Sequence, residues 1–323
     1  MISPPPSPPT TYLDLRRTLY CGFSDFDADE RVLRQAWSFF IHQPDAVWHD
    51  GKTFCCGIYR MADHRWAFGF FETKGVDQAA FQSEWQSLRM AFPGAWAGPL
   101  QGSTFLPYRF ITSGESHPLF PGEWRNQAHY GPWMEQLGPS RVTTYRSAYR
   151  TEYREVIAVS DAFLADWEER GFALRPFDLT DAEGWTALHY MIEAIFHGNW
   201  GYKALTQAEF TSWAQSLGQS HGGQPWLYWV FIGERRIGFA YLFFLKDGTL
   251  IFKTIGLLPE FQAQKVGNAV AGKLHKMALE AGATRCIYAL VQTENRVNRM
   301  PDPDITVFRT YASYEFDPLP AHA

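Results

Sequence analysis

The stretch FQAQKVGNAVAGKL (Phe261–Leu274) passes from a loop into a helix around Gly267. The residues before it, TLIFKTIGLLP (Thr249–Pro259), are almost continuously apolar or β-branched and end at a proline, which is typical of a buried strand. After the helix, Gly282 supplies a stop signal, and TRCIYALV (Thr284–Val291) predicts a second apolar strand. The sequence therefore predicts a strand–helix–strand unit whose loop ends at a helix N-terminus.

This loop has the composition of an anion-binding site. A helix N-terminus presents unpaired backbone N–H groups and a partial positive charge, which together suit a phosphate group. Gly267 and Ala269 leave room for a ligand to approach closely, and Gln264 and Asn268 carry side-chain amides that can donate hydrogen bonds. The alternative, an ordinary turn between strand and helix, stays open for so short a motif.

The segment before this unit predicts further elements in a regular order. A helix over Asp161–Gly171 is followed by a strand over Phe172–Pro176 and by two more helices. Capping boxes formed by Thr180 with Glu183 and by Thr206 with Glu209 open those two helices. An antiparallel meander then follows, with strands over Trp226–Ile232, Arg236–Leu245 and Thr249–Pro259.

The first half of the chain repeats this order with different residues. Strands are expected over 54–60 and 65–72, a helix over Asp77–Ala91, and a further strand over 95–100. The helix carries an apolar face, made by Phe81, Trp85, Leu88 and Phe92. We therefore expect an α+β fold with two similar domains, each a central mixed sheet flanked by helices, at residues 16–165 and 166–323.

The composition fits a globular protein of two domains. The chain has 323 residues, of which 46% are hydrophobic and 17% aromatic, enough to build large cores. Its net charge of −5, from 29 basic and 34 acidic residues, gives no overall basic field for a nucleic-acid backbone, although a local patch could still form. Five of the first nine residues are proline, so residues 1–15 are expected to be an extended, disordered lead.

The four cysteines favour a reducing compartment. Cys21, Cys55, Cys56 and Cys286 show no C-x-x-C spacing, so neither a disulfide framework nor a zinc site is expected. The N-terminus lacks the pattern of a signal peptide, and no segment approaches the length of an apolar membrane span. A cytoplasmic protein without a membrane partner is the expectation.

The pattern Q-x-x-G-x-A at Gln264, Gly267 and Ala269 resembles the acyl-coenzyme A loop of the GNAT N-acetyltransferase family, whose signature is Q/R-x-x-G-x-G/A. The resemblance extends over Phe172–Val291, with the meander in the family's order. It implies that acetyl-CoA or another acyl-CoA is the co-substrate. It assigns the pantetheine arm to the strand at Leu257 and Leu258. It assigns the pyrophosphate to the loop residues Gln264, Lys265, Val266, Gly267, Asn268 and Ala269, with Asn295 just beyond the next strand.

The first half resembles the same family only near its end. NQAHYGPWMEQLG (Asn126–Gly138) is similar to the family's late N-x-x-A-x-x-x-Y-x-x-x-G-F helix. However, ETKGVDQA, between the strand and helix of this half, does not contain the acyl-CoA loop. The chain therefore resembles a tandem GNAT protein whose N-terminal half is degenerate and has lost the cofactor.

The general acid of the family is not where the resemblance would place it. Many members carry a tyrosine on a helix after the last strand, but here Pro301 and Pro303 interrupt that region. Tyr311 and Tyr314 lie in the expected closing strand. Tyr314 is taken as the candidate acid, with structural burial as the alternative for both tyrosines.

One predicted helix carries His189, Glu193 and His197 along one side. Three successive turns extend over about 12 Å, too far for all three side chains to meet at one ion, so no metal is expected. Glu193 is the candidate general base that removes a proton from an acceptor amine, with a solvated polar face as the alternative.

The loop after this helix is the candidate acceptor site. Asn199, Trp200 and Tyr202 combine aromatic surface with polar groups, as in pockets that bind polar small molecules. The alternative is that these aromatic side chains pack against the core.

Three functions remain open from the sequence. The first is an N-acyltransferase that moves an acyl group, acetyl above all, from acyl-CoA to an amine of a small molecule by direct attack. The second is a GNAT-fold transferase that takes its donor from charged tRNA or an acyl carrier protein, and the third is a non-catalytic ligand-binding module.

Overall fold

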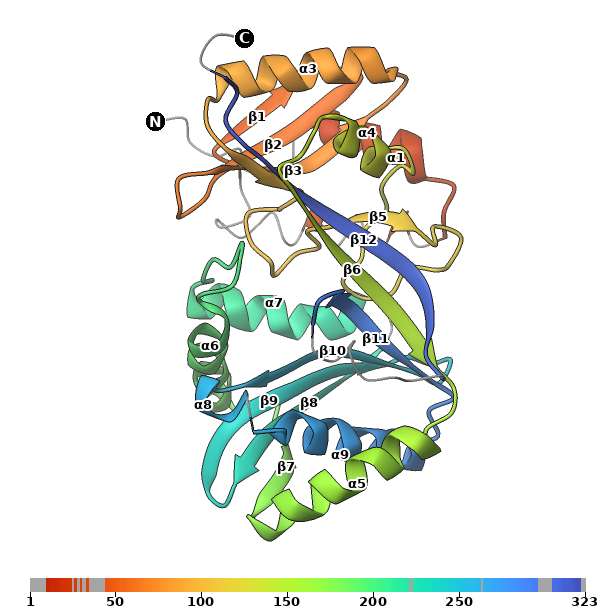
Figure 1. Ribbon diagram of the computed structural model, residues 1–323, viewed down its shortest axis with the longest axis vertical. Coiled ribbons are helices and arrows are strands. Elements are labelled where there is room, and N and C mark those ends of the chain that lie inside the picture. Colours follow the sequence, from red (N-terminus) through yellow and green to blue (C-terminus); the bar gives the residue numbers. More distant parts are fainter. Residues whose placement is uncertain are drawn as a thin grey trace. The chain divides into compact units, whose positions relative to one another are not determined.

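The computed structural model describes residues 10–24, 26–27, 30, 33–34, 44–220, 223–262, 264–295 and 304–320. Figure 1 labels its helices and strands. In chain order they are α1 (Thr10–Tyr20), β1 (Ala46–His49), β2 (Phe54–Arg60), β3 (Trp66–Thr73), α3 (Gln78–Ala91), β4 (Trp96–Gly98), β5 (Phe110–Ser113), α4 (Tyr130–Gln136), β6 (Arg141–Arg150), α5 (Arg154–Glu169), β7 (Phe172–Pro176), α6 (Ala182–Phe196), α7 (Gln207–Ser220), β8 (Gln224–Ile232), β9 (Arg235–Phe244), β10 (Thr249–Leu257), α8 (Pro259–Gln262), α9 (Val266–Glu280), β11 (Arg285–Gln292) and β12 (Thr306–Phe316).

The chain divides into two compact units. Unit 1 comprises residues 1–145, 200–204 and 309–323, and unit 2 comprises residues 146–199 and 205–308. The chain therefore changes unit within β6 and again within β12, so the last strand of the chain completes unit 1. A single cut of the chain does not separate these units. The division into two similar domains at residues 16–165 and 166–323 remains a prediction.

Unit 2 contains the predicted meander and strand–helix–strand unit. Its strands follow the order β11-β10-β9-β8-β7. The pairs β8–β9 and β9–β10 are antiparallel, and β10–β11 is parallel, as a crossover through α9 requires. Gly282, with φ of +78°, directly follows the C-cap of α9, which confirms the predicted stop.

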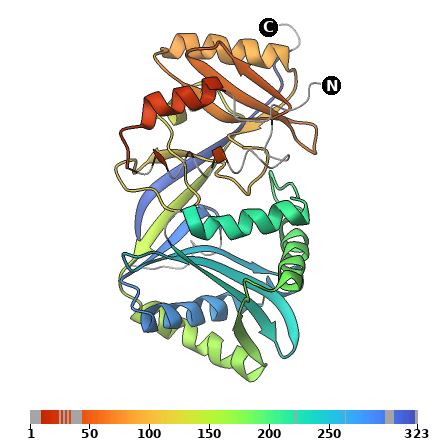
Figure 2. The same ribbon diagram turned by 180° about the vertical axis from the view of Figure 1, so that it is seen from behind.

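Helices cover both faces of the unit 2 sheet. α5 and α9 lie side by side on one face, and α6 and α7 lie on the other (Figures 1 and 2). The main core of this unit lies under α5 and α9, where the fully buried Val266, Val270 and Leu274 of α9 pack with Leu250 of β10. The core thus fixes the start of α9 against the strand that precedes it.

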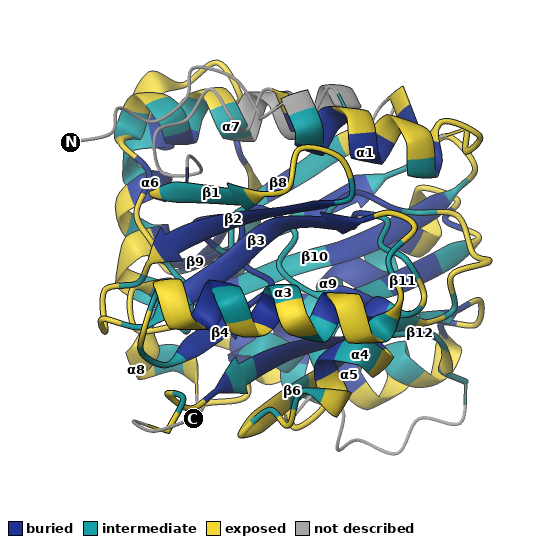
Figure 3. Ribbon diagram, turned by 90° about the horizontal axis from the view of Figure 1, so that it is seen from above, coloured by how far each residue is buried: buried dark blue, intermediate teal, exposed yellow. Residues whose placement is uncertain are grey.

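Unit 1 has the same sequence of a meander and a helix. β1, β2 and β3 pair in antiparallel fashion, and β3 pairs in parallel with β4 after the crossover through α3. Figure 3 shows α3 with buried residues on one side and exposed residues on the other. The buried side contains Phe81, Trp85 and Leu88, and Phe92 packs against the same cluster, which confirms the predicted apolar face.

Two local predictions were wrong. Residues 10–15 are not part of a disordered lead, because they form the start of α1 and bury Tyr12, Leu13 and Leu15. The remainder of the predicted lead, residues 1–9, lies outside the described residues. Thr180 does not cap α6.

Asp181 is the N-cap of α6 and accepts a hydrogen bond from Glu183 N, because its carboxylate is one residue closer to the free N–H groups than the Thr180 hydroxyl. The second capping box is confirmed by the reciprocal hydrogen bonds between Thr206 and Glu209 at the start of α7.

The contact between α5 and α9 makes a stability prediction. A Cβ atom added at Gly272 would lie 2.5 Å from Ser160 Cβ, so Gly272→Ala should cost about 1–3 kcal/mol through overpacking and lower the melting temperature by several degrees. Gly267→Ala is the matched control on the same helix, because its Cβ would meet only Leu257 Cδ1 at 3.8 Å. Thermal unfolding of both variants checks this. Equal melting temperatures would contradict close packing of α5 on α9.

Candidate functional site

The site begins where β10 separates from β11. The register between these parallel strands extends from Thr249 paired with Arg285 to Phe252 paired with Tyr288, and no later pair is formed by the described residues. In contrast, β10 continues to pair with β9 as far as Leu257. The last five residues of β10 therefore have a neighbouring strand on one edge only.

Local backbone irregularities hold the two strands apart. The register of β10 against β9 shifts between Phe252 and Thr254, at the point of separation. On β11, Leu290 has a positive φ of 58°, and its N–H donates to the Ser147 hydroxyl of β6 at 3.0 Å. At Leu290, β11 is therefore hydrogen-bonded to β6 and not to β10.

The open edge of β10 presents backbone N–H groups at known positions. Leu258 N donates to Ile237 O of β9 at 2.9 Å, so its N–H points toward β9. Because successive residues of a strand direct their N–H groups to opposite sides, those of Leu257 and Ile255 point toward the open edge. The Leu257 carbonyl on that edge already accepts a hydrogen bond from Gln262 Nε2 at 2.9 Å.

The N-terminus of α9 lies directly after this strand. Its N-cap is Lys265, which adopts the left-handed conformation (φ 62°) and makes no side-chain capping hydrogen bond. A left-handed residue beside a helical one turns successive N–H groups toward one point, as in backbone anion nests. The first turn of α9 contains no acidic residue, so the helix dipole is not offset there by a carboxylate.

The small residue in the first turn leaves space for a ligand. Gly267 has no positive φ, and a Cβ there would meet only Leu257 Cδ1 at 3.8 Å, so the backbone does not require glycine. The adjacent Val266 and the more distant Ala269 are fully buried and fix the turn in the core. Lys265 is exposed, and its Nζ lies 5.3 Å from the centre of the Phe163 ring.

Two predicted ligand contacts are already engaged within the chain. The Gln264 amide donates to Glu260 O at 2.6 Å, so this donor secures the end of α8. The Leu258 N–H is used by β9, as described above. Asn268 donates its backbone N–H to Lys265 O at 2.9 Å. The groups that remain for a ligand are chiefly backbone N–H groups.

The corresponding helix start in unit 1 is built differently. α3 is capped by Asp77, whose carboxylate accepts from Ala80 N at 2.8 Å. Near the end of β3, the buried Glu72 carboxylate accepts hydrogen bonds from Arg16 (2.6 Å), Tyr20 (2.9 Å) and Tyr130 (2.8 Å). Side chains of the protein thus fill this region and place a carboxylate where α9 has none. These contacts support the predicted loss of the cofactor from the N-terminal half.

A buried polar group lies at the point where β10 and β11 separate. His275 of α9 donates from Nδ1 to Ala271 O at 2.6 Å and accepts at Nε2 from the Tyr288 hydroxyl at 2.5 Å. The Phe252 ring stacks on the imidazole at 4.8 Å, and Arg150 lies 5.5 Å from the Tyr288 ring. Burial lowers the pKa of His275 to about 4 and raises the pKa of Tyr288. The sequence motifs gave no signal for this cluster.

The predicted catalytic residues occupy different environments. Glu193 is exposed on α6 in unit 2. Tyr314 is fully buried in unit 1, where its hydroxyl contacts Gly131 O at 3.4 Å and burial raises its pKa. A side chain without exposure cannot reach a leaving thiolate, so the burial of Tyr314 argues against its predicted acid role. Asn295 is exposed after β11, and its N–H donates to Gln292 O at 2.9 Å.

The predicted acceptor loop is divided between the units. Asn199 is exposed and belongs to unit 2, whereas Trp200 and Tyr202 belong to unit 1. Trp200 packs near Tyr108, with ring centres 5.8 Å apart, and Tyr202 packs near Phe105 at 5.7 Å. His189 is buried and its Nε2 is 2.8 Å from Leu205 O, so this histidine has a structural partner.

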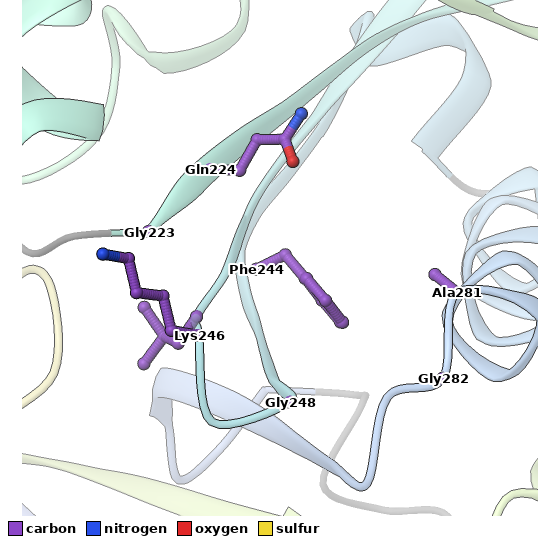
Figure 4. A pocket seen from close by; sticks show the side chains of 8 residues that line it. Gly223, Gln224, Phe244, Lys246, Gly248, Ala281 and Gly282 are labelled. Carbon is purple, nitrogen blue, oxygen red and sulfur yellow. The ribbon is translucent and has the colours of Figure 1, made fainter.

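Neither a metal cluster nor a membrane-spanning helix occurs in the part of the chain that the structure describes. An open pocket of about 480 Å³ lies beside Ala281 and Gly282, at the opposite end of α9 from the loop. Figure 4 shows Phe244 extending toward Ala281 while the amine of Lys246 points away. Lys246 is the one ionisable residue among those that line it, so this pocket lacks the chemistry of the candidate site.

Comparisons with known proteins establish the fold. No family model and no curated protein matches the sequence. Among solved structures, a tandem GNAT protein from the clavulanic acid biosynthesis pathway has a TM-score of 0.50 and 9% identity, covering 90% of this chain and 88% of that one. A GCN5-related N-acetyltransferase from Anabaena variabilis has a TM-score of 0.51 and 10% identity, covering 97% of this chain and 72% of that one. The chain therefore has a tandem GNAT fold, which confirms the predicted fold class.

The buried His275 predicts a pH dependence of stability. Its pKa of about 4 lies below the ordinary value of 6.5, so between these values the unfolded chain binds a proton that the folded chain does not. Its contribution is therefore complete above pH 6.5 and is lost as the pH falls toward 4. At about 1.4 kcal/mol per pH unit, the unfolding free energy should fall by about 2 kcal/mol from pH 7 to pH 5 through this residue.

Denaturant unfolding of His275→Gln at both pH values should show a smaller decrease than the wild type. The exposed His197→Gln is the matched control and should keep the wild-type difference. An unchanged difference in His275→Gln would show that His275 is not the group that titrates.

Proposed function

We propose that this protein is an N-acyltransferase that moves an acyl group, acetyl above all, from acyl-CoA to an amine of a small molecule. The observation that carries the proposal is the open edge of β10 leading directly to the uncapped N-terminus of α9. A donor with a pyrophosphate and an amide-containing arm matches this pair of features. The tandem GNAT fold supports it at the level of architecture.

Each part of the donor has a proposed partner. The backbone N–H groups of the first turn of α9, around Gly267, would hold the pyrophosphate. The N–H groups of Ile255 and Leu257 would pair with the pantetheine arm as a neighbouring strand does. N–H groups near the separation point would polarise the thioester carbonyl, which lowers the barrier to attack by the amine. The amine nitrogen forms the new C–N bond directly, the C–S bond of the thioester breaks, and CoA leaves as a thiolate that takes up a proton, so no covalent enzyme intermediate is needed.

The acceptor amine must lose a proton during the attack. Glu193 is the proposed general base, because its exposed carboxylate is carried by α6, a helix of unit 2. Asn199, Trp200 and Tyr202 remain the proposed acceptor residues. No metal is part of the proposed mechanism. A cytoplasmic location belongs to the proposal, since all four cysteines are free thiols.

A donor held by tRNA or by an acyl carrier protein is the second candidate for the same fold. The net charge of −5 disfavours tRNA. A gel shift with charged tRNA at low and moderate salt decides this point, because binding through phosphate contacts must weaken as salt rises. A thiol-release assay with a panel of amines separates an enzyme from a non-catalytic module.

Gly267→Val is the variant that tests the donor site. The valine side chain would occupy the space in front of the first turn of α9, so CoA affinity should fall by at least tenfold in isothermal titration calorimetry. The fold should persist, because a Cβ there would make only an ordinary contact, 3.8 Å from Leu257 Cδ1, and valine is no poorer a helix former than glycine.

Acetyl-CoA, longer acyl-CoAs and CoA itself are the ligands for this titration, and the melting temperature of the variant is the control for folding. Unchanged CoA affinity in Gly267→Val would remove the start of α9 from the site. No binding of any of these ligands by the wild type would overturn the acyl-CoA proposal and leave the carrier-bound donors.

A further inference from the structure

Unit 1 contains an arginine that packs against two tyrosine rings. The Arg109 guanidinium carbon lies 3.7 Å from the centre of the Tyr108 ring and 4.1 Å from that of Tyr145. One of its terminal nitrogens, Nη2, donates to the Tyr108 hydroxyl. The two rings are nearly perpendicular (88°) with their centres 6.1 Å apart, so they contact the guanidinium from adjacent directions and not from its two opposite faces.

This cation has no acid partner among the described residues. Its one hydrogen bond is to a phenol, and burial raises the pKa of that phenol, Tyr108, to about 12, so it stays uncharged at neutral pH. Nε of Arg109 is enclosed and has no hydrogen-bond acceptor within the described chain. A partly buried arginine ordinarily pairs with a carboxylate, so the arrangement lacks the negative charge that would complete it.

The arginine is connected to the candidate acceptor loop through Tyr108. The Tyr108 ring contacts Arg109 and also lies 5.8 Å from the Trp200 ring. The loop is fixed in this position, because Thr104 N donates to Gly201 O at 3.1 Å and the Ser103 hydroxyl donates to Lys203 O at 3.1 Å. The enclosed indole N–H of Trp200 also lacks an acceptor in the described chain. Two enclosed donors without an acceptor in the described chain, Arg109 Nε and Trp200 Nε1, thus lie near one ring.

We propose that Arg109, Tyr108, Tyr145 and Trp200 form a recognition site in unit 1 for a carboxylate, and that its ligand is a small molecule that carries one, as an amino acid does. The inference goes beyond the proposed function, because all four residues belong to unit 1. A guanidinium donates charge-assisted hydrogen bonds to a carboxylate. The aromatic rings add surface for the rest of the molecule.

A carboxylate, with its single negative charge, fits this cluster better than a phosphate does. One guanidinium supplies one positive charge, and neither a second cation in contact with it nor a helix N-terminus is part of the cluster. A phosphate dianion ordinarily binds to several cations or to a helix start.

The test measures binding of the twenty standard amino acids and of their decarboxylated amines by calorimetry, in the presence and absence of CoA. At least one amino acid should bind, and its decarboxylated amine should bind at least tenfold more weakly, because a charge-assisted hydrogen bond is lost. Phosphoethanolamine is included as the phosphate-bearing probe. Equal binding of an amino acid and its amine, preference for the phosphate, or no binding of any amino acid would overturn the proposal.

Two substitutions place the recognition at this residue. Arg109→Gln should lower the affinity for the amino acid by at least tenfold. Arg109→Lys should retain only part of the wild-type affinity, because lysine keeps the charge but lacks the planar guanidinium. Arg60→Gln is the matched control, since Arg60 also lies over a ring, that of Trp66 at 4.4 Å, but is exposed elsewhere on unit 1. Unchanged affinity in Arg109→Gln would overturn the proposal.

CoA affinity should be the same in the wild type and in these three variants. This measurement separates the two proposals. If the wild type does not bind CoA, the proposal of an acyl-CoA donor is refuted. Carboxylate recognition through Arg109 would still be decided by the amino-acid titrations.

Discussion

The separation of β10 from β11 is the constraint on which the candidate site depends. Parallel strands that stop pairing leave backbone N–H and C=O groups without partners, and each such buried group costs about 1–3 kcal/mol. Here β10 stays bonded to β9 along its other edge to Leu257, and Leu290 is bonded to Ser147, so neither strand can close the opening without losing existing hydrogen bonds. Under the proposed function, the amide-containing arm of the donor would pair with this open edge.

The two halves of the molecule differ at the corresponding helix start. At the start of α9 the N-cap is Lys265, without a side-chain cap, whereas at the start of α3 the carboxylate of Asp77 occupies the equivalent N–H groups. A phosphate would be attracted by the partial positive charge at the start of α9 and repelled by the Asp77 carboxylate at the start of α3. In unit 1 the buried Glu72 carboxylate, near the end of β3, also accepts hydrogen bonds from Arg16, Tyr20 and Tyr130.

The sequence predicted the elements of unit 2 well because their signals are local. The apolar run of β10, the stop at Gly282 and the capping box at Thr206 each act within a few residues, and the comparison with solved structures confirms the fold class. The capping box at Thr180 was wrong, because Asp181 competes for the same N–H groups, and the predicted lead was wrong at residues 10–15 because α1 gains its stability from burial in unit 1.

The parts of the site that sequence reasoning missed depend on distant residues. Ile255 faces the open edge only because of the register with β9, and the His275–Tyr288 pair joins a helix to a strand. Tyr145 and Trp200 reach the vicinity of Tyr108 and Arg109 from separate segments of the chain. Hydrophobic periodicity and short motifs do not contain this information.

Hydrogen–deuterium exchange with and without saturating CoA tests the central claim most directly, because it reports on individual segments of backbone. The account predicts slower exchange in two segments, the open part of β10 at residues 253–257 and the start of α9 at residues 264–270, with little change in β2, β3 and α3 of unit 1. Binding of CoA without protection of these two segments, or with protection centred on α3, would contradict it.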